Sequence, residues 1–321
     1  MLGHSIEDIL LTCKFNNQKC AANDFEWIFD RLYGNCYLFN SGQSKKASLI
    51  AGSWYGLKLS MYTNNHQKLN IFNSLFGFGS YIRIGNGSYL TDDTFKEISL
   101  APGFITSVSV DRSFKFLLAK PYSRCDIDDE HRDFNSNLYE TIYRSQYEYT
   151  QELCFVTCYQ FELIKVCNCS DPWFINFVKE KDVCETNEQT NCLVDVYNQV
   201  FLSSDFIENS CLNICPLECN RTEYKCSLSS SQLDPMWFVD FINDRKNLSN
   251  DFMSAKIDLD TVRQSVVSFN VFYDSLSYTL STESPKFDIV SLLSNIGGAL
   301  SLFMGVSVMS VVEIFALILD I

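Results

Sequence analysis

The sequence predicts an α+β protein: a disulfide-rich extracellular β-sheet that carries a helical subdomain and leads into one C-terminal transmembrane helix. Three observations support this fold class. The chain has 14 cysteines in 321 residues, strand-like alternation in its first 120 residues, and a long uncharged run near its C-terminus. In a chain of this length, so many cysteines are typical of the oxidising side of a membrane.

Charge and composition narrow the class of function. The formal net charge is −14, whereas a nucleic-acid-binding protein needs a basic surface. An acidic surface can concentrate cations, although acidity can also serve solubility alone. The three histidines and the cysteine spacings fit no zinc site, so we expect no metal and no cofactor. Hydrolase, zinc-protease and dinucleotide-binding motifs are absent, so we expect no catalytic residue and no enzyme, including an enzyme anchored at the cell surface.

The start of the chain carries no secretory signal, because the apolar stretch at 6–11 is too short. A disulfide-bonded extracellular domain must nevertheless reach the lumen, so we expect the natural N-terminus to lie upstream of this sequence. Acceptor triplets for N-glycosylation at Asn86, Asn220 and Asn247 suit the same compartment.

The chain divides into four regions that differ in composition and periodicity. Residues 1–120 combine turn formers at short intervals with alternating segments, which predicts a mostly antiparallel β region. Residues 121–226 have helical periodicity and clustered cysteines, and residues 227–287 return to strand character towards the membrane. Residues 288–319 form the predicted transmembrane helix.

The cysteine spacing in the second region predicts a ladder of disulfides. Cys154 and Cys158 lie one turn apart on one face of an expected helix, and the spacing recurs at Cys211, Cys215 and Cys219. If the two helices run antiparallel, the expected pairs are Cys154–Cys215 and Cys158–Cys211, which leaves Cys219 to pair with Cys125. Beyond the first helix, Cys167 and Cys169 could pair with Cys192 and Cys184 as a nested set, although spacing alone does not prove this connectivity. Such a ladder makes a stiff lever; spacing alone leaves redox-active cysteines as an alternative.

The C-terminal run holds 24 residues without a formal charge, from 289 to 312, and is followed by Glu313. This length spans a hydrocarbon core of about 30 Å. Small and polar residues interrupt the run and could pack closely or supply oxygens to an ion: Gly297, Gly298, Ser301, Gly305, Ser307 and Ser310. Glu313 should face a water path or a partner, because a carboxylate in hydrocarbon is costly. The alternative is a plain anchor for a cysteine-rich receptor or adhesion ectodomain.

The motifs of this run resemble the second transmembrane helix of the epithelial sodium channel/degenerin family, to which the acid-sensing ion channels also belong. They are Glu-Ser-Pro at 283–285, Leu-Leu-Ser-Asn-Ile-Gly-Gly at 292–298, Gly-Val-Ser at 305–307 and Ser-Val-Val-Glu at 310–313. Segments at 9–16, 33–40, 56–59 and 101–103 are similar to the family's finger and palm. The cysteine ladder is similar to its thumb, so the resemblance covers nearly the whole chain.

The resemblance implies a subunit of a sodium-selective, amiloride-sensitive and voltage-independent cation channel. It implies a trimer with subunits of the same family, homomeric or heteromeric, in the lipid bilayer of the plasma membrane, with Na⁺ as the permeant ion. Gly305, Val306 and Ser307 would form the selectivity filter. The regions named above would then be finger and palm, thumb, knuckle and palm return, and pore helix.

Four further roles follow from the resemblance. Ser294 falls where bulky substitutions hold degenerin-type channels open, and Ser301 falls where amiloride acts. Glu313 corresponds to an acidic residue just below the filter, and Tyr122 to an aromatic that couples the thumb to the first transmembrane helix. The alternative is that the serines only pack and that Tyr122 is a core aromatic.

The chain departs from the family in having one transmembrane helix instead of two. We therefore expect an N-terminally truncated fragment that begins within the finger and does not conduct by itself. Cys13 and Cys20 should close a local loop, whereas Cys36 lacks its usual upstream partner and could pair with the surplus Cys226. The acidic thumb residues are either a solvated face or a proton-sensitive surface: Glu185, Glu188, Asp195, Asp205 and Glu208.

Overall fold

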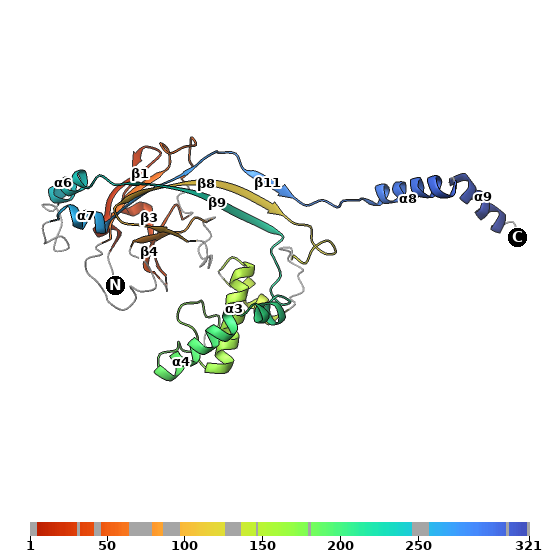
Figure 1. Cartoon of the computed structure of the whole chain (residues 1–321), viewed down its shortest axis with the longest axis horizontal. Helices are drawn as coiled ribbons and strands as arrows, with labels where there is room; N and C mark the ends of the chain where they lie inside the picture. Colours follow the sequence, from red (N-terminus) through yellow and green to blue (C-terminus); the bar gives the residue numbers. More distant parts are fainter. Residues whose placement is uncertain are drawn as a thin grey trace.

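A computed structural model describes the chain over residues 5–30, 33–41, 46–63, 79–85, 97–125, 136–145, 147–178, 181–245, 257–305 and 308–319. Figure 1 shows a β-sheet body, a helical region below it, and two C-terminal helices that extend away from both. This mixed α+β architecture confirms the coarse fold class.

The main sheet has seven strands within the described residues: β1 (Leu10–Phe15), β2 (Gln18–Lys19), β5 (Leu57–Tyr62), β8 (Phe104–Phe116), β9 (Asn220–Gln232), β10 (Val266–Tyr273) and β11 (Thr279–Thr282). Their order is β11-β8-β10-β5-β1-β2, and β9 lies along the other edge of β8. Strands β10 and β11 run parallel to β8, unlike the antiparallel pairs elsewhere in this sheet. The strand β9 begins at Asn220, before residue 226, where the sequence placed the end of the helical region.

Two hairpins and a helical cap surround the sheet. The hairpins are β3 (Phe25–Asp30) with β4 (Gly34–Phe39), and β6 (Ser80–Ile82) with β7 (Ile98–Leu100). Short helices α1 (Ile6–Ile9) and η1 (Ala22–Asp24) flank β1 and β3. Helices α6 (Pro235–Arg245) and α7 (Leu259–Ser265) bury Phe238, Ile242 and Val262 against strand residues such as Tyr62, which forms one apolar core.

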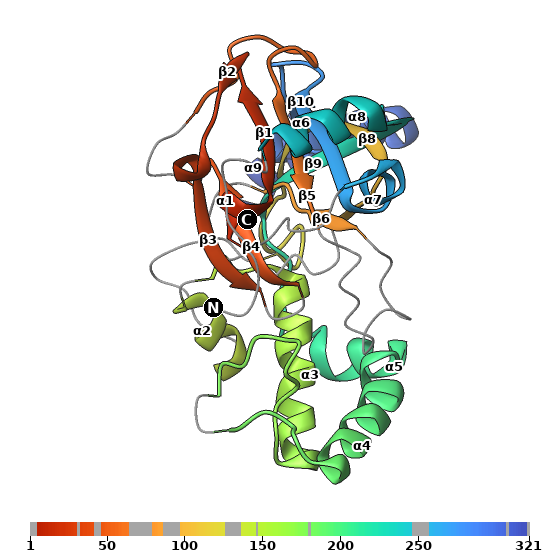
Figure 2. The same ribbon diagram turned by 90° about the vertical axis from the view of Figure 1, so that its left-hand side faces the viewer.

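The helical region is built on α3 (Gln151–Cys167), which Figure 2 shows running away from the sheet with α4 and α5 beside it. The other elements are α2 (Asn137–Tyr143), α4 (Asn187–Val196), η2 (Tyr197–Phe201), α5 (Ser204–Phe206) and η3 (Ile207–Cys211). Thr150 caps the start of α3 by accepting from the Leu153 backbone N–H at 3.0 Å, and Asn168 ends the helix in the left-handed conformation. The chain returns from β11 to α8 (Ile289–Met304) and α9 (Val308–Leu319).

Gly56 sits where no side chain fits. A Cβ at this position would overlap the Val271 carbonyl oxygen and come within 2.6 Å of Phe272 Cβ. We expect Gly56→Ala to lower the free energy of unfolding by about 1–3 kcal/mol, because the clash is partly with backbone that cannot move freely. Thermal unfolding of the purified protein measures this change. The control is Gly298→Ala in α8, whose Cβ would meet nothing within 4 Å; equal midpoints for the two variants would contradict the expectation.

Candidate functional site

The predicted C-terminal helix is two helices in the structure. Asp288 caps the start of α8 by accepting from the Ser291 backbone N–H at 2.8 Å. The helix ends at Gly305, which has φ +65° and donates its N–H to the Ser301 carbonyl at 3.0 Å. A left-handed glycine is a standard helix terminus, and this explains why the single helix expected over 288–319 is interrupted. Within the described ranges, no helix combines the length and the apolarity needed to cross a membrane.

Helix α8 is exposed along its length. Ile289, Leu302 and Phe303 are 77%, 81% and 84% exposed, and the helix touches neither the sheet nor the helical region in Figure 1. Large contiguous apolar surfaces of this kind mark contacts with a membrane or with other protein chains.

The predicted pore residues of α8 share one face. Ser294, Ser301 and Gly305 are separated by seven and four positions, which is two turns and one turn of an α-helix. Both serines are exposed, and so is Glu313 on α9. The serines therefore do not pack inside this chain. Val306 and Ser307 lie outside the described residues, as do Asn86 and Asn247.

Tyr122 lies in the loop that connects the sheet to the helical region. Its side chain is 63% exposed, so it is not a core aromatic. The loop begins after β8 and carries a cis Lys120–Pro121 bond. It is tied to the start of β9 by the Cys125–Cys219 disulfide and by the Leu117 N–H, which donates to the Cys219 carbonyl at 2.8 Å.

Charged side chains join the helical region to the sheet beside this loop. Arg221 on β9 lies 3.4 Å from Glu152 on α3 and 3.4 Å from Glu223. Lys115 on β8 donates to Glu223 at 2.8 Å, and this bond is the main cause of the lowered pKa of Glu223. Glu218 accepts from the Gln151 N–H at 3.1 Å, and burial raises the pKa of the Glu218 carboxyl. Of these residues, Glu152, Glu218, Arg221 and Glu223 border a cavity of about 420 Å³.

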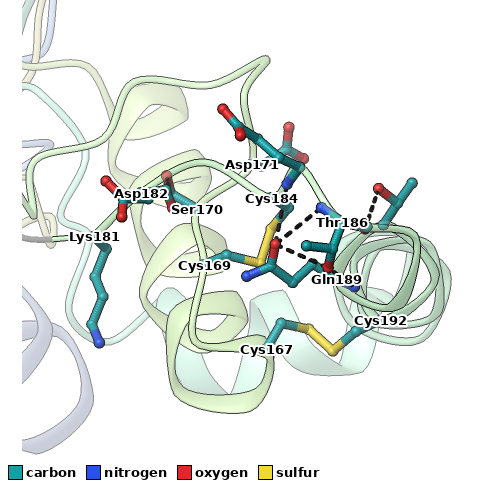
Figure 3. The surroundings of a disulfide bond; sticks show 12 residues. Cys167, Cys169, Ser170, Asp171, Lys181, Asp182, Cys184, Thr186, Gln189 and Cys192 are labelled. Carbon is teal, nitrogen blue, oxygen red and sulfur yellow. Dashed lines mark hydrogen bonds between the residues drawn. A yellow bond between two sulfur atoms is a disulfide. The ribbon is translucent and has the colours of Figure 1, made fainter.

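Six disulfides are present among the described residues, and they are the same pairs that the sequence predicts: Cys13–Cys20, Cys125–Cys219, Cys154–Cys215, Cys158–Cys211, Cys167–Cys192 and Cys169–Cys184. The second helix assumed for the ladder is shorter than expected, however. α5 and η3 run together from residue 204 to Cys211, where the helix ends, and Cys215 follows with its N–H donating to the Cys211 carbonyl at 2.9 Å. Figure 3 shows two disulfides at the C-terminal end of α3. Cys167–Cys192 joins α3 to α4, and Cys169–Cys184 closes the loop between these two helices.

Cys36 and Cys226 carry free thiols, so the pairing considered for them is not formed in the structure. They lie in different sheets, Cys36 on β4 of the β3–β4 hairpin and Cys226 on β9 at the edge of the main sheet. Burial is the main cause that raises the pKa of the Cys36 thiol to about 11. A protonated thiol is a poor nucleophile, which argues against a redox-active role for Cys36.

The acidic residues singled out in the helical region are all exposed, as expected for a solvated face: Glu185, Glu188, Asp195, Asp205 and Glu208. Sequence reasoning missed a different carboxylate, Asp171, which is only 3% exposed and lies beside α3. Tyr159 donates its hydroxyl to Asp171 at 3.1 Å, and the Trp173 backbone N–H donates at 2.9 Å. Burial is the main cause that raises the pKa of Asp171.

Asp171 should make the helical region more stable in acid. Because the native pKa lies above the usual value of 3.8, its stabilising contribution is fully present below about pH 4 and is lost as pH rises through the raised pKa. We expect Asp171→Asn to flatten the rise of the unfolding temperature between pH 7 and pH 4, since the amide keeps an acceptor but carries no charge. The exposed Asp182→Asn is the control. An unchanged pH profile in Asp171→Asn would contradict this account.

Comparison with known proteins supports the resemblance described above. The family model "Amiloride-sensitive sodium channel" matches residues 1–317. The chain is 28% identical over 322 residues to epithelial sodium channel subunit beta-2 of Xenopus laevis, covering 99% of this chain and 48% of that protein. It is 29% identical to subunit gamma of Neoceratodus forsteri (99% and 47%) and 29% identical to subunit alpha of Mus musculus (98% and 43%).

The chain thus spans about half the length of the curated relatives it matches. These relatives are ion-channel subunits, which confirms the prediction that the chain is not an enzyme. The match of the family model to nearly the whole chain decides the assignment: the chain belongs to the amiloride-sensitive sodium channel family.

Proposed function

We propose that this chain is part of a subunit of a sodium-selective, amiloride-sensitive and voltage-independent cation channel of the plasma membrane. The subunit assembles as a trimer with subunits of the same family. Residues 1–120 form its extracellular finger and palm, and residues 121–226 form its thumb. Residues 227–287 form the knuckle and the palm return to the membrane, and residues 288–319 form the pore segment. Asn86, Asn220 and Asn247 are glycosylated on the extracellular side; of these, Asn220 is exposed at the start of β9.

The observation that carries this proposal is the exposed, broken C-terminal segment. Apolar side chains are exposed along α8 and α9, so the segment needs an apolar environment that the described part of the chain does not supply. One face of α8 nevertheless carries Ser294, Ser301 and Gly305, which gives a polar stripe suited to a water-filled path between copies. A plain anchor helix needs neither the stripe nor the break.

The break also suits a selectivity filter. A helix that ends at Gly305 leaves backbone carbonyls without intrahelical partners, and such oxygens can replace part of the hydration shell of Na⁺. Gly305, Val306 and Ser307 form this filter in the proposal. Ser301 contributes to amiloride binding one turn above it, Ser294 lies at the gate, and Glu313 attracts cations below it.

Gating in this proposal begins in the thumb. The disulfides of α3 make the helical region stiff. A displacement of this region therefore moves its base, where Arg221 and the Tyr122 loop meet the sheet. Tyr122 is exposed and free to contact the first transmembrane helix of the complete subunit. The palm strands then transmit the change to α8 as a shift between closed and open states.

The test is expression of the complete transcript that contains this chain in oocytes under voltage clamp. We expect an inward current that depends on external sodium, varies little with voltage and is blocked by amiloride. A bulky Ser294→Trp variant should increase it if the basal current is small. Protein that reaches the surface, detected by biotinylation, but carries no current with or without Ser294→Trp would favour a receptor or a non-conducting subunit.

A further inference from the structure

One contact joins two segments that are far apart in the sequence and central to gating. The Glu283 carboxylate accepts from the Leu118 backbone N–H at 2.9 Å, across a separation of 165 residues. Glu283 is the first residue after β11 and lies on the stretch that leads to α8. Leu118 lies in the loop that leads from β8 towards the thumb.

Leu118 is held in place from several sides. Its carbonyl accepts from the Ser123 hydroxyl at 2.5 Å, and its neighbour Leu117 donates to the Cys219 carbonyl at 2.8 Å. The Cys125–Cys219 disulfide closes the same loop onto the residue just before β9, where the chain enters the sheet from the thumb. A movement of the thumb base therefore moves the Leu118 N–H.

The other end of the contact has little else to hold it. Residues 283–288 are all exposed, and among these residues Glu283 makes the hydrogen bonds to the described part of the sheet body. Its N–H donates to the Phe116 carbonyl at 2.9 Å, and its carboxylate reaches on to Leu118. Beyond it come Pro285 and the Asp288 cap, so α8 follows directly.

We propose that Glu283 is a positioning residue that couples the thumb loop at Leu118 to the pore helix α8. The hydrogen bond from the Leu118 N–H to the charged Glu283 carboxylate fixes the segment that precedes α8 to the thumb loop. The segment and the loop therefore move together when the channel opens or closes. This inference rests on the proposed channel function for its consequence on current, but the coupling itself can be measured without current.

The experiment follows the position of α8 by the rate at which a thiol reagent modifies Ser294→Cys in the complete subunit at the cell surface. Modification is quantified by mass spectrometry on the peptide that contains residue 294, because Cys36 and Cys226 also carry free thiols. Glu283→Ala, Glu283→Gln and Ser284→Ala are compared in this background. Glutamine keeps an acceptor oxygen for Leu118, and Ser284→Ala leaves the Glu283 carboxylate in place.

We expect Glu283→Ala to change the modification rate by about 3- to 10-fold, as loss of one such bond would shift an equilibrium between two states, whereas the other two variants stay near the parent rate. The fraction of channels that are open at rest should also change in Glu283→Ala and stay near the parent value in the other two variants. Equal rates in all variants, or Glu283→Gln behaving like Glu283→Ala, would overturn the proposal. Altered rates in a subunit that never conducts would instead refute the channel function while leaving the coupling intact.

Discussion

Replacing Gly305 by valine is expected to remove most of the amiloride-sensitive sodium current while leaving the amount of subunit at the surface unchanged. Gly305 has φ +65°, which costs an L-residue about 1–2 kcal/mol and a β-branched residue more. Valine would favour continuing α8 through the break, which would return the freed carbonyl oxygens to intrahelical bonds. Current normalised to surface protein measures the effect.

Gly305→Asn is the matched control, because asparagine tolerates the left-handed conformation better than other residues with a side chain. It should keep a substantial part of the current lost in Gly305→Val. If the valine variant conducts like the parent, the break at Gly305 is not needed for conduction and the filter must be formed in another way.

Removal of two rungs of the thumb ladder should have the largest effect on stability. Cys154–Cys215 and Cys158–Cys211 close loops of 61 and 53 residues, and cross-links of this span contribute about 4 kcal/mol in the chain-entropy model. The sulfurs are also buried in one apolar core with Leu138, Ile142 and Leu153. Changing all four cysteines to alanine should therefore unfold the helical region well below the parent temperature.

A single rung should matter less, because the remaining rung keeps the long loop closed. We expect the Cys154→Ala, Cys215→Ala pair to cost about 2 kcal/mol, roughly the value for the short loop that it opens. Urea unfolding followed by limited proteolysis between residues 136 and 219 measures both effects. Equal losses for the double and quadruple variants would contradict the ladder as a set of nested cross-links.

The parts of the fold that could be predicted from the sequence are those fixed by local periodicity. Cysteines four positions apart share a helix face, so the bridges of α3 follow from spacing even though Cys215 lies beyond the end of η3. The strands β5, β8 and β10 can be predicted from their alternating or β-branched residues. The parallel pairing of β10 with β8 could not be predicted, because it depends on segments more than 150 residues apart.

The missed features of the candidate site have a common cause. Hydropathy shows an unbroken apolar run over Gly305, whereas the break there is a matter of backbone conformation. Asp171 follows Ser170 and precedes Pro172, a sequence typical of an exposed turn, yet Gln160 and Tyr159 on α3 bind this turn and bury the carboxylate. The Glu283–Leu118 contact likewise depends on tertiary structure. The helix-break signal was available in the sequence, since glycine is the usual residue at a left-handed helix end.

The most direct test of the central claim is the reversal potential of the current when external sodium is replaced by potassium, compared between the parent subunit and Ser307→Trp. The account predicts that the parent potential follows the sodium gradient and shifts strongly negative on replacement, and that Ser307→Trp either abolishes the current or removes this preference. A parent current that does not distinguish the two ions, or a Ser307→Trp current as selective as the parent, would contradict the assignment of a sodium filter to this segment.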